Sequence, residues 1–522
     1  MAKVVTAQEA VSHIKDDSVL YVNGMLYIGG CEPFYKEVEK RFLETGHPKN
    51  MTLFAACGVG HTTSSDPSIP PELANRIAYP GLVTTLITSH VQSYIKFMPM
   101  IMNNEIECYI IPQGTVAQML HSAARRAAGT ITRIGLKTHA DPRYQGGAFN
   151  EISKRAISKL IEIEGKEYLF YPNIYPDVCI IRGTTADVNG NITMEHECCV
   201  YDPMAVAMAT HNNGGLVIVQ VERLNGGYAN PQLVKIPGRL IDYIYVDPDQ
   251  KQTANVKYDG SYSGEIRIPE SQLSADATAD TAALALRPRS VKVICRRAAL
   301  ELKKGDLANL GIGMATSIGL DAVDMGTIEM KDIAFTVELG IFGGVPAGSA
   351  SFGANFNADA VYEQATQFEF YEGYGLDKTF VGALEFDSHG NVNVCRSGKK
   401  LIGVGGFNYV TSGTKCAVFT SKFMSKSDYT VDENGKLVPV TAGFQKIKKD
   451  VEYINFNGEV ASENGQRALY ITERAVFELV NGELVITEVS PYVDLQKDVL
   501  DLIPFPIKVA EDLKLMPQIC FE

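Results

Sequence analysis

The feature that most constrains the fold of this chain is a short turn motif that occurs twice, 200 positions apart. DVNGNI starts at Asp187 and DSHGNV starts at Asp387, and both read Asp-x-x-Gly-Asn followed by an aliphatic residue. Each motif lies between two apolar runs, which predicts a hairpin turn between two strands. Residues 10–24 and 298–313 also correspond, because both predict a helix, a polar turn, a strand and a glycine. Two matches in the same order predict two copies of one fold.

Strand-like and helix-like segments alternate in the first half of the chain. Apolar runs rich in β-branched residues occur at 52–56, 83–88 and 107–111, and helical spacing occurs at 91–103 and 115–128. This alternation is typical of βαβ units with a parallel sheet. We therefore predict an α/β protein made of two related open α/β domains.

The boundary between the two copies is predicted in residues 249–288. A chain of 522 residues is too long for a single core. Residues 249–288 lack sustained periodicity and are rich in Ser, Asp, Thr and Gly, as in a linker that lies on a surface. The predicted organisation is an N-terminal domain at 1–248, a linker at 249–288 and a C-terminal domain at 289–522.

Charge and hydropathy exclude several classes of partner. A net charge of −13 argues against a general nucleic-acid binder, which normally presents a basic face. No apolar run is long enough for a transmembrane helix, and the N-terminus has no apolar core of the kind found in secretory signals. We expect a cytoplasmic enzyme without a nucleic-acid or membrane partner.

No metal site is predicted from the histidines and cysteines. His196 lies close in sequence to Cys198 and Cys199, but adjacent cysteines rarely provide two bonds to one tetrahedral ion. No second pair of ligands is within reach in the sequence. These three residues are interpreted as structural.

The stretch 332–355, DIAFTVELGIFGGVPAGSASFGAN, combines a predicted strand, a carboxylate and a glycine-rich loop. Glu338 follows the apolar strand, and ligands collect at the carboxyl ends of strands in open α/β sheets. A carboxylate beside glycine N–H donors has the parts of a nucleophile facing an oxyanion site. The alternative is a strand followed by a glycine-rich loop with a solvated Glu, which the residues alone favour.

The same stretch resembles the active-site segment of the family I coenzyme A transferases, most closely the single-chain propionate/acetate branch. The family motif is Glu-x-Gly-x-x-Gly-Gly-x-Pro-x-Gly, which reads here as Glu338, Gly340, Gly343, Gly344, Pro346 and Gly348. The resemblance runs from Ala7 to about Leu515. It implies two α/β domains with the active site in the cleft between them. It also implies that Glu338 attacks a thioester and carries coenzyme A (CoA) transiently as a glutamyl thioester.

The partners that this resemblance implies are an acyl-CoA and a short monocarboxylic acid of the acetate, propionate, butyrate or lactate class. CoA is then a substrate, and no cofactor or metal is expected. A homo-oligomer is also expected. No run of arginines lies beside the motif to pair with a second carboxylate, so dicarboxylates are predicted to be poor substrates.

Two further glycine segments are candidate parts of the site. Gln113 and Gly114 occupy a predicted strand-to-helix turn, which is either an anion or carbonyl site or simply a tight turn. Gly403, Gly405 and Gly406 form a cluster that either offers N–H donors or makes a glycine-rich bulge. The resemblance implies that Gln113 and Gly114 lie near the active site and that Gly405 and Gly406 help to form the oxyanion hole.

The remaining candidates also depend on the resemblance. Gly343, Gly344 and Gly403 are assigned to CoA binding. Tyr374 replaces a glycine of the family pattern, and it either lines the acid pocket or points to solvent. The tetrapeptide Ser462–Gly465, SENG, matches the catalytic segment of succinate-type relatives, but its context predicts a type I′ hairpin turn. The chemistry is therefore assigned to Glu338.

Three other functions remain open at this stage. A thioester hydrolase on the same fold would differ only in the access of water to the site. A nucleotide-binding oxidoreductase would fit the βαβ pattern, although the chain lacks a clear G-x-G-x-x-G followed by an acidic residue about 20 positions later. The third is a non-catalytic binding module, against which the intact Glu338 loop argues.

Overall fold

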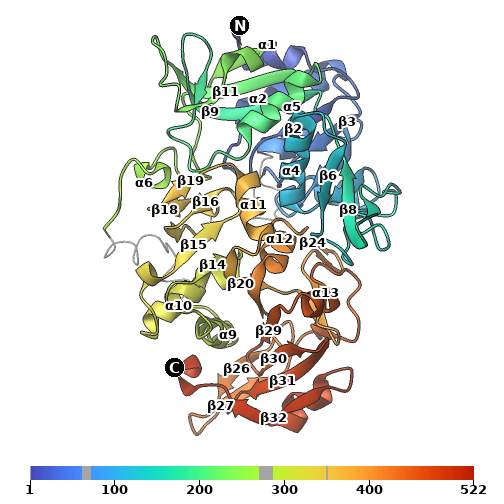
Figure 1. Cartoon of the computed structure of the whole chain (residues 1–522), viewed down its shortest axis with the longest axis vertical. Helices are drawn as coiled ribbons and strands as arrows, with labels where there is room; N and C mark the ends of the chain where they lie inside the picture. The colour runs from blue at the N-terminus through green and yellow to red at the C-terminus, as the bar shows by residue number, and fades with distance from the viewer. Residues whose placement is uncertain (1, 61–71, 270–285, 349–350) are drawn as a thin grey trace.

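The fold contains two large sheets, one in each half of the chain. The structure is a computed structural model that describes residues 2–60, 72–269, 286–348 and 351–522. Figure 1 shows the two halves placed end to end, with the N-terminus at the top and the C-terminus near the bottom. Among the described residues, no helix has the length and apolar character needed to cross a membrane.

The first sheet is parallel along its main path. Its strand order is β1-β13-β11-β9-β2-β3-β4-β5, and β10 and β12 extend it with antiparallel pairs beside β9. Its strands are β1 (Lys3–Val4), β2 (Val19–Val22), β3 (Met51–Phe54), β4 (Val83–Thr88), β5 (Glu107–Ile110), β9 (Val178–Ala186), β10 (Ile192–Thr193), β11 (Leu216–Leu224), β12 (Val234–Ile236) and β13 (Tyr243–Val246). The three strands predicted at 52–56, 83–88 and 107–111 are confirmed as β3, β4 and β5.

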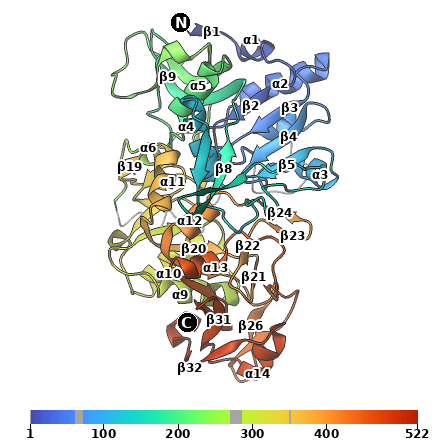
Figure 2. The same cartoon turned by 45° about the vertical axis from the view of Figure 1, so that its right-hand side comes forward.

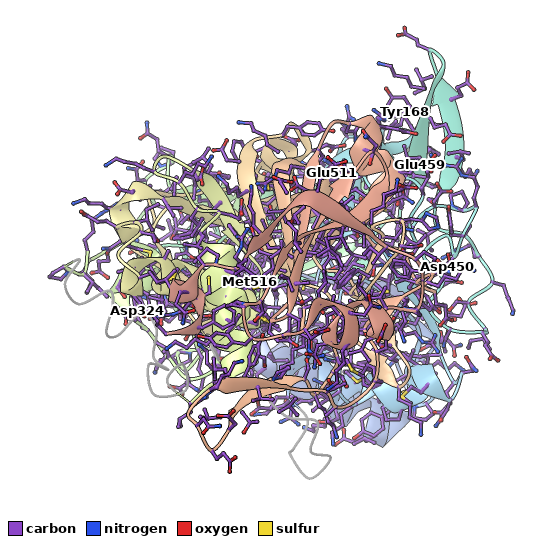
Figure 3. All side chains as sticks on the ribbon, turned by 90° about the horizontal axis from the view of Figure 1, so that it is seen from below. Tyr168, Asp324, Asp450, Glu459, Glu511 and Met516 are labelled. Carbon is purple, nitrogen blue, oxygen red and sulfur yellow. The ribbon has the colours of Figure 1, made fainter. Side chains whose placement is uncertain are left out.

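Helices connect the parallel strands, as crossovers require. They are α1 (Ala7–Ser12), α2 (Glu32–Thr45), α3 (Phe97–Met102), α4 (Gln113–Ala124), α5 (Pro203–Asn212) and the 3₁₀ turns η1 (Leu73–Ile77) and η2 (Gly238–Leu240). The helix predicted at 91–103 begins only at Phe97. A separate sheet of β6 (Gly129–Thr132), β8 (Lys166–Pro172) and β7 (Lys159–Ile163) carries a hairpin that projects from the body near Tyr168 (Figure 3).

The second sheet is parallel at its centre, from β15 to β29, and is flanked by antiparallel pairs, and its last pair, β31 with β32, is again parallel. Its order is β19-β16-β15-β14-β20-β25-β29-β30-β31-β32. The strands are β14 (Leu307–Leu310), β15 (Ala334–Val337), β16 (Ile341–Phe342), β19 (Ala360–Val361), β20 (Leu376–Gly382), β25 (Thr414–Thr420), β29 (Arg467–Ile471), β30 (Ala475–Val480), β31 (Glu483–Val489) and β32 (Lys508–Leu515). Its helices are α9 (Arg289–Ala299), α10 (Ile318–Asp324), α11 (Gln364–Glu372), α12 (Phe407–Ser412), α13 (Gly458–Glu463) and α14 (Leu495–Asp498).

Short strands and turns complete the second half. The strand pairs and small sheets are β17 (Val345–Pro346) with β18 (Asn355–Phe356), β21 (Glu385–Asp387) with β22 (Val392–Asn393) and β28 (Ile447–Lys448), β23 (Arg396–Ser397) with β24 (Lys400–Leu401), and β26 (Asp428–Val431) with β27 (Leu437–Val440). The 3₁₀ turns are η3 (Met314–Ser317), η4 (Met330–Asp332), η6 (Leu500–Leu502) and η7 (Gln518–Phe521).

The two repeated motifs form the same turn. In the first, Oδ1 of Asp187 accepts the N–H groups of Asn189 and Asn191 at 2.8 and 2.9 Å. In the second, Oδ1 of Asp387 accepts the N–H groups two and four residues later at 3.0 and 2.9 Å. The neighbouring strands also correspond, since the order β9-β2-β3 in the first sheet matches β20-β14-β15 in the second. The repeat seen in the sequence is thus a repeat of the fold.

The described part of the segment 249–288 packs on both halves. In the N-terminal half, the Gln250 side chain donates to the Gly183 carbonyl oxygen at 2.9 Å. The contacts with the C-terminal half follow later in the segment. The segment contains the one-turn helix α6 (Gly260–Ser263), and the Tyr262 ring packs on Phe356 with centroids 4.7 Å apart. Farther along, Ile268 and Asn357 exchange two hydrogen bonds of 2.8 Å. Residues 270–285 lie outside the described part.

The hairpin turn predicted at Ser462–Gly465 is wrong. Residues up to Glu463 belong to α13, and Gly465 ends that helix with a φ of +65°. A left-handed glycine just after a helix is a common C-terminal signal. Glu463 is exposed and lies 3.5 Å from Lys137 Nζ, so this segment does not contribute a buried carboxylate.

Candidate active site

Glu338 occupies the tip of a tight hairpin between β15 and β16. Val337 pairs with Ile341, so Glu338, Leu339 and Gly340 form the connecting turn. β15 lies between β16 and β14, third from one edge of the sheet, and its carboxyl end points toward the first half. The sequence predicted a strand followed by a glycine-rich loop, and the structure shows a hairpin that fixes the carboxylate at the strand end.

Gly406 lies directly against this carboxylate. A methyl group built on its α-carbon would stand 2.6 Å from Glu338 Cγ and 3.2 Å from Oε1, so only glycine fits without moving the glutamate. Among the described residues, no acceptor takes the Gly406 N–H. The structure thus brings Gly406 and Glu338 together, and the role of Gly406 in an oxyanion hole remains a prediction.

The Gly405 N–H is engaged elsewhere, contrary to the prediction that it is an oxyanion donor. It donates to the Ser89 carbonyl oxygen at 2.9 Å, which also accepts the Val404 N–H at 2.7 Å. Gly403 forms a β-bridge with His90 in the same contact. The glycine cluster is thus the segment on which a loop of the first half docks. This docking places Gly406 beside Glu338 and leaves Gly403 without free space for a ligand.

Gln113 brings the first half to the same place. Its backbone N–H donates to the Gly405 carbonyl oxygen at 3.0 Å, and its side-chain amide donates to Gln364 Oε1 at 3.1 Å. It therefore joins α4 to both the glycine cluster and α11. Figure 2 shows α11 and α12 between the two sheets, beside α4.

Gly114 has a packing role in this structure. A Cβ atom there would lie 2.5 Å from the ring of Phe368 on α11. The glycine thus lets α4 and α11 approach each other closely. This close packing by itself accounts for a glycine at position 114.

The surroundings of Glu338 raise its pKa. Burial raises the pKa of the carboxyl group above the ordinary value of 4.5, and the Asn309 side chain opposes part of this rise. The charge of Glu338 in turn raises the pKa values of the Tyr371 hydroxyl and the Cys57 thiol. Cys57 comes from the first half, and burial raises its pKa to about 12, so it remains a neutral thiol. The carboxylate therefore lies among uncharged groups.

Gly343 and Gly344 are explained by the local backbone. Both have a φ of +75°, and a Cβ on them would lie 2.1 Å from Asp359 and 2.2 Å from the Phe356 carbonyl oxygen. These contacts hold the chain between β16 and β17 in place. Their assignment to CoA binding remains a prediction.

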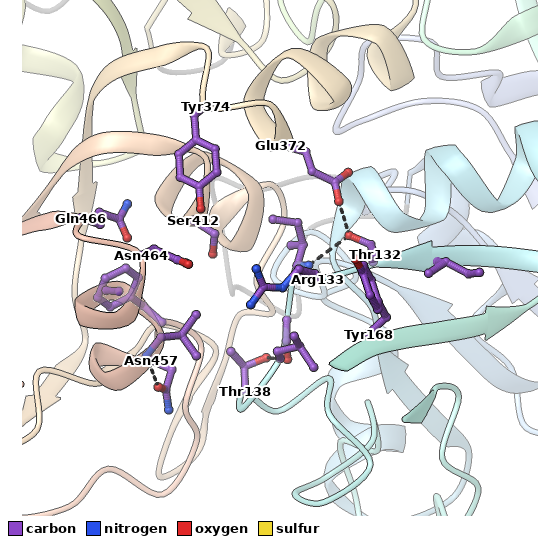
Figure 4. Close-up of a pocket in the computed structure, with 17 residues that line it drawn as sticks. Thr132, Arg133, Thr138, Tyr168, Glu372, Tyr374, Ser412, Asn457, Asn464 and Gln466 are labelled. Atoms are coloured by element: carbon purple, nitrogen blue, oxygen red, sulfur yellow. Dashed lines mark hydrogen bonds between the residues drawn. The ribbon is translucent and has the colours of Figure 1, made fainter. Parts of the chain in front are cut away.

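Tyr374 does not line the space around Glu338. It follows α11 at the end opposite Gln364, about 12 Å along the helix axis at 1.5 Å per residue. Its ring points into a cavity of about 270 Å³ between the two halves, opposite Arg133 and near Asn464 (Figure 4). Glu338 and Gly406 are not among the residues that line this cavity. Tyr374 therefore lines a cavity other than the space beside Glu338, and its placement in the acid pocket remains a prediction.

Sequence reasoning missed three residues of the site. Asn309 is buried on β14, in register with Thr336 of β15, and Ser89 and Gln364 make the contacts described above. Asn309 had a visible signal, since it is a polar residue inside the apolar run that precedes Gly311. Ser89 and Gln364 had none, because their contacts with Gly405 and Gln113 form only when the two halves dock.

The assembled geometry suits acyl transfer. A partly buried carboxylate lies close to Gly406, whose backbone N–H has no acceptor among the described residues, and the neighbouring Tyr371 and Cys57 side chains are neutral. These are the requirements for a carboxylate nucleophile whose attack on a carbonyl carbon develops an oxyanion.

Comparisons with known proteins agree with this geometry. The family model described as "Coenzyme A transferase" matches residues 4–247. Caffeate CoA-transferase of Acetobacterium woodii is 38% identical over 99% of this chain and 97% of its own length. Acetate CoA-transferase YdiF of Escherichia coli O157:H7 is 37% identical over 99% of this chain and 95% of its own.

The fold is also that of a solved relative. The crystal structure of the acyl-CoA transferase YdiF from E. coli O157:H7, described as a thioester complex with CoA, superposes with a TM-score of 0.88. It shares 34% sequence identity and covers 100% of this chain and 96% of that one. On this full-length similarity, the chain belongs to the coenzyme A transferase family, as a single-chain CoA-transferase of family I.

Proposed function

We propose that this enzyme transfers CoA from a short-chain acyl-CoA to a short-chain monocarboxylic acid through a glutamyl-CoA thioester on Glu338. The observation that carries the proposal is the contact between Glu338 and Gly406 where the two halves meet. The YdiF structure described as a thioester complex with CoA supports covalent capture of CoA in a relative. CoA acts as a substrate, and no step needs a resident cofactor.

The reaction proceeds in two symmetrical halves. A carboxylate oxygen of Glu338 attacks the thioester carbonyl carbon and forms an oxyanion. The oxyanion collapses and expels the CoA thiolate, and an acyl–glutamyl anhydride remains on the enzyme. The thiolate then attacks Cδ of Glu338 and expels the free acid, which gives glutamyl-CoA. An acceptor carboxylate attacks the same Cδ and forms a new anhydride with release of thiolate. The thiolate then attacks the acceptor's carbonyl carbon, which yields the new acyl-CoA and free Glu338.

The protein contributes a fixed donor and a sheltered site. Preorganised donors at an oxyanion are worth about 3–4 kcal/mol each in other enzymes, and the Gly406 N–H is the available donor beside Glu338. Water must be kept from the glutamyl intermediates, because hydrolysis would lose the thioester energy. Docking of residues 89–91 on residues 402–405 closes one side of the site.

The acid class is proposed from the relatives and the absence of a second anchor. YdiF is named an acetate CoA-transferase, and the A. woodii relative is named for caffeate, so both act on monocarboxylates. Among the described residues, no arginine or lysine shifts the pKa of Glu338. We also propose a cytoplasmic location and a homo-oligomer.

Covalent capture is the direct test. The enzyme is incubated with propionyl-CoA, treated with borohydride and digested, and mass spectrometry is expected to find the modification at Glu338. Glu338→Gln should show none, whereas Glu369→Gln, which removes an exposed carboxylate on α11, should be modified normally. Normal turnover by Glu338→Gln would refute the assignment.

An acceptor panel tests the reaction class and the acid. Acetate, propionate, butyrate, lactate, caffeate and succinate are compared by kcat/KM. Thioester loss at the same rate without any acceptor would indicate a hydrolase. A higher kcat/KM for succinate than for all monocarboxylates would refute the proposed class, and a preference for caffeate would move it from short-chain to aromatic acids.

A further inference from the structure

Three side chains that commonly bind metals converge where the two halves meet. His121 lies in the last turn of α4, Asp202 precedes α5, and Glu363 precedes α11. One ligand atom from each lies within 4.8 Å of the others. The first two residues belong to the N-terminal half and the third to the C-terminal half.

Their spacing fits a common ion. His121 Nε2 lies 3.4 Å from Asp202 Oδ1 and 3.7 Å from Glu363 Oε2. Ligand atoms about 2.1 Å from a tetrahedral ion are about 3.4 Å apart, so one ion could contact all three with small adjustments. A nitrogen with two carboxylate oxygens also leaves a position open for water.

A buried and unpaired oxygen supplies an independent indication. The Asp202 side chain is fully buried, and its Oδ1 accepts the Ala365 N–H at 2.9 Å. Its Oδ2 has no hydrogen-bond partner among the described residues. A buried carboxylate oxygen without a donor is costly. The oxygen that lies 3.4 Å from His121 Nε2 is Oδ1, so an ion would satisfy Oδ2 where Asp202 binds it with both oxygens.

The local charge also favours a cation. Two carboxylates face one imidazole in this cluster. A divalent ion would remove the repulsion between the carboxylates more completely than a protonated imidazole.

We propose that His121, Asp202 and Glu363 bind one divalent transition-metal ion. Imidazole with two carboxylates suits zinc or manganese better than magnesium, which prefers oxygen ligands and retains its water. The ion joins α4 and α5 to the start of α11. Glu363 precedes Gln364, which binds Gln113, so the ion stabilises the contact of α4 with α11 beside the active site. It takes no part in the chemical steps.

The test measures metal binding by the intact protein. The enzyme is stripped with EDTA, loaded with zinc, manganese or magnesium, and desalted, and its metal content and melting temperature (Tm) are determined. We expect about one zinc per chain, a higher Tm with zinc, and much weaker binding of magnesium. His121→Gln and Glu363→Gln should each weaken zinc binding at least about tenfold by calorimetry.

A surface pair serves as the control. His47 contacts Asp16 at 2.9 Å but belongs to no group of three ligands among the described residues, so His47→Gln should bind zinc as the wild type does. Circular dichroism confirms that each variant is folded. No zinc uptake by the wild type, or equal affinity in the wild type and both ligand variants, would overturn the proposal. Because activity is not the readout, this outcome would leave the role of Glu338 untouched.

Discussion

Gly406 and Glu338 lie so close that a methyl group on the glycine would stand 2.6 Å from Glu338 Cγ. This approach joins the glycine segment before α12 to the hairpin tip after β15. It places a backbone N–H beside the carboxylate and excludes any side chain from the space between them. The candidate site depends on this contact.

Gly406→Ala should therefore disable the enzyme without unfolding it. The added Cβ would push the Glu338 carboxylate away, and a misplacement of about 1 Å costs about 100-fold in rate. We expect kcat to fall by about 100- to 1,000-fold, measured with propionyl-CoA and acetate, while Tm changes little.

Gly405→Ala is the matched control for this variant. The atom nearest to the added Cβ would be Gln113 Oε1, at 3.9 Å, so the side chain fits. The backbone φ of +53° disfavours alanine, however, and should cost about 1 kcal/mol of stability. Lower stability with nearly normal kcat is expected. Equal losses of kcat in the two variants would show that Gly406 has no special relation to Glu338.

Glu338→Gln should raise stability while it abolishes transfer. Burial raises the pKa of Glu338, so the folded state holds the ionised group less favourably than water does. Removing the charge should raise Tm by about 1–3 °C at neutral pH, measured by calorimetry. A lower Tm for the variant would show that the carboxylate stabilises the fold.

The pH dependence of the wild type follows from the same shift. Attack requires the ionised carboxylate, so kcat/KM should fall as pH decreases through a pKa above 4.5. The measurement is kcat/KM for the acyl-CoA from pH 4 to 8, within the range where the protein stays folded. An acidic limb below pH 4.5 would contradict a buried nucleophile.

Gly114→Ala should destabilise the protein by steric conflict. Its Cβ would stand 2.5 Å from the Phe368 ring, between α4 and α11, and overpacking of this kind costs about 1–3 kcal/mol. The urea midpoint should fall. Gly226→Ala is the control, since no atom lies within 4 Å of its Cβ and the position is exposed. An unchanged midpoint in Gly114→Ala would refute the packing role.

The repeated turns should respond oppositely to pH. Burial raises the pKa of Asp387 above 3.8, whereas hydrogen bonds lower the pKa of Asp187 despite its burial. A group with a raised folded-state pKa binds protons more tightly when folded, so acidification favours folding. From pH 7 toward 4, the Tm of the wild type should rise relative to Asp387→Asn. Relative to Asp187→Asn, the Tm of the wild type should fall on acidification. Because the pKa of Asp187 is lowered, this fall should begin at a lower pH than the rise seen with Asp387→Asn. The same trend for both variants would contradict the assignment.

The sequence alone was enough to identify the family, the duplicated α/β fold and Glu338 as the candidate nucleophile. These features are local or periodic. The Asp-x-x-Gly-Asn turns fix their own hydrogen bonds within five residues, and the strand before Glu338 is specified by consecutive apolar residues. The same local signals failed at Ser462–Gly465, where Asn-Gly suits a helix end as well as a hairpin.

Only the tertiary structure decided which groups surround Glu338. The Ser89 carbonyl oxygen accepts the Gly405 N–H, and the sequence could not show that, of these two glycines in the described part of the chain, Gly406 is the one whose N–H has no acceptor. Tyr374 is carried away from Glu338 by the length and direction of α11. His121, Asp202 and Glu363 meet only because α4, α5 and α11 pack together. The physical reason is the same in each case: contacts between distant segments depend on how rigid elements dock, and no local pattern encodes that geometry.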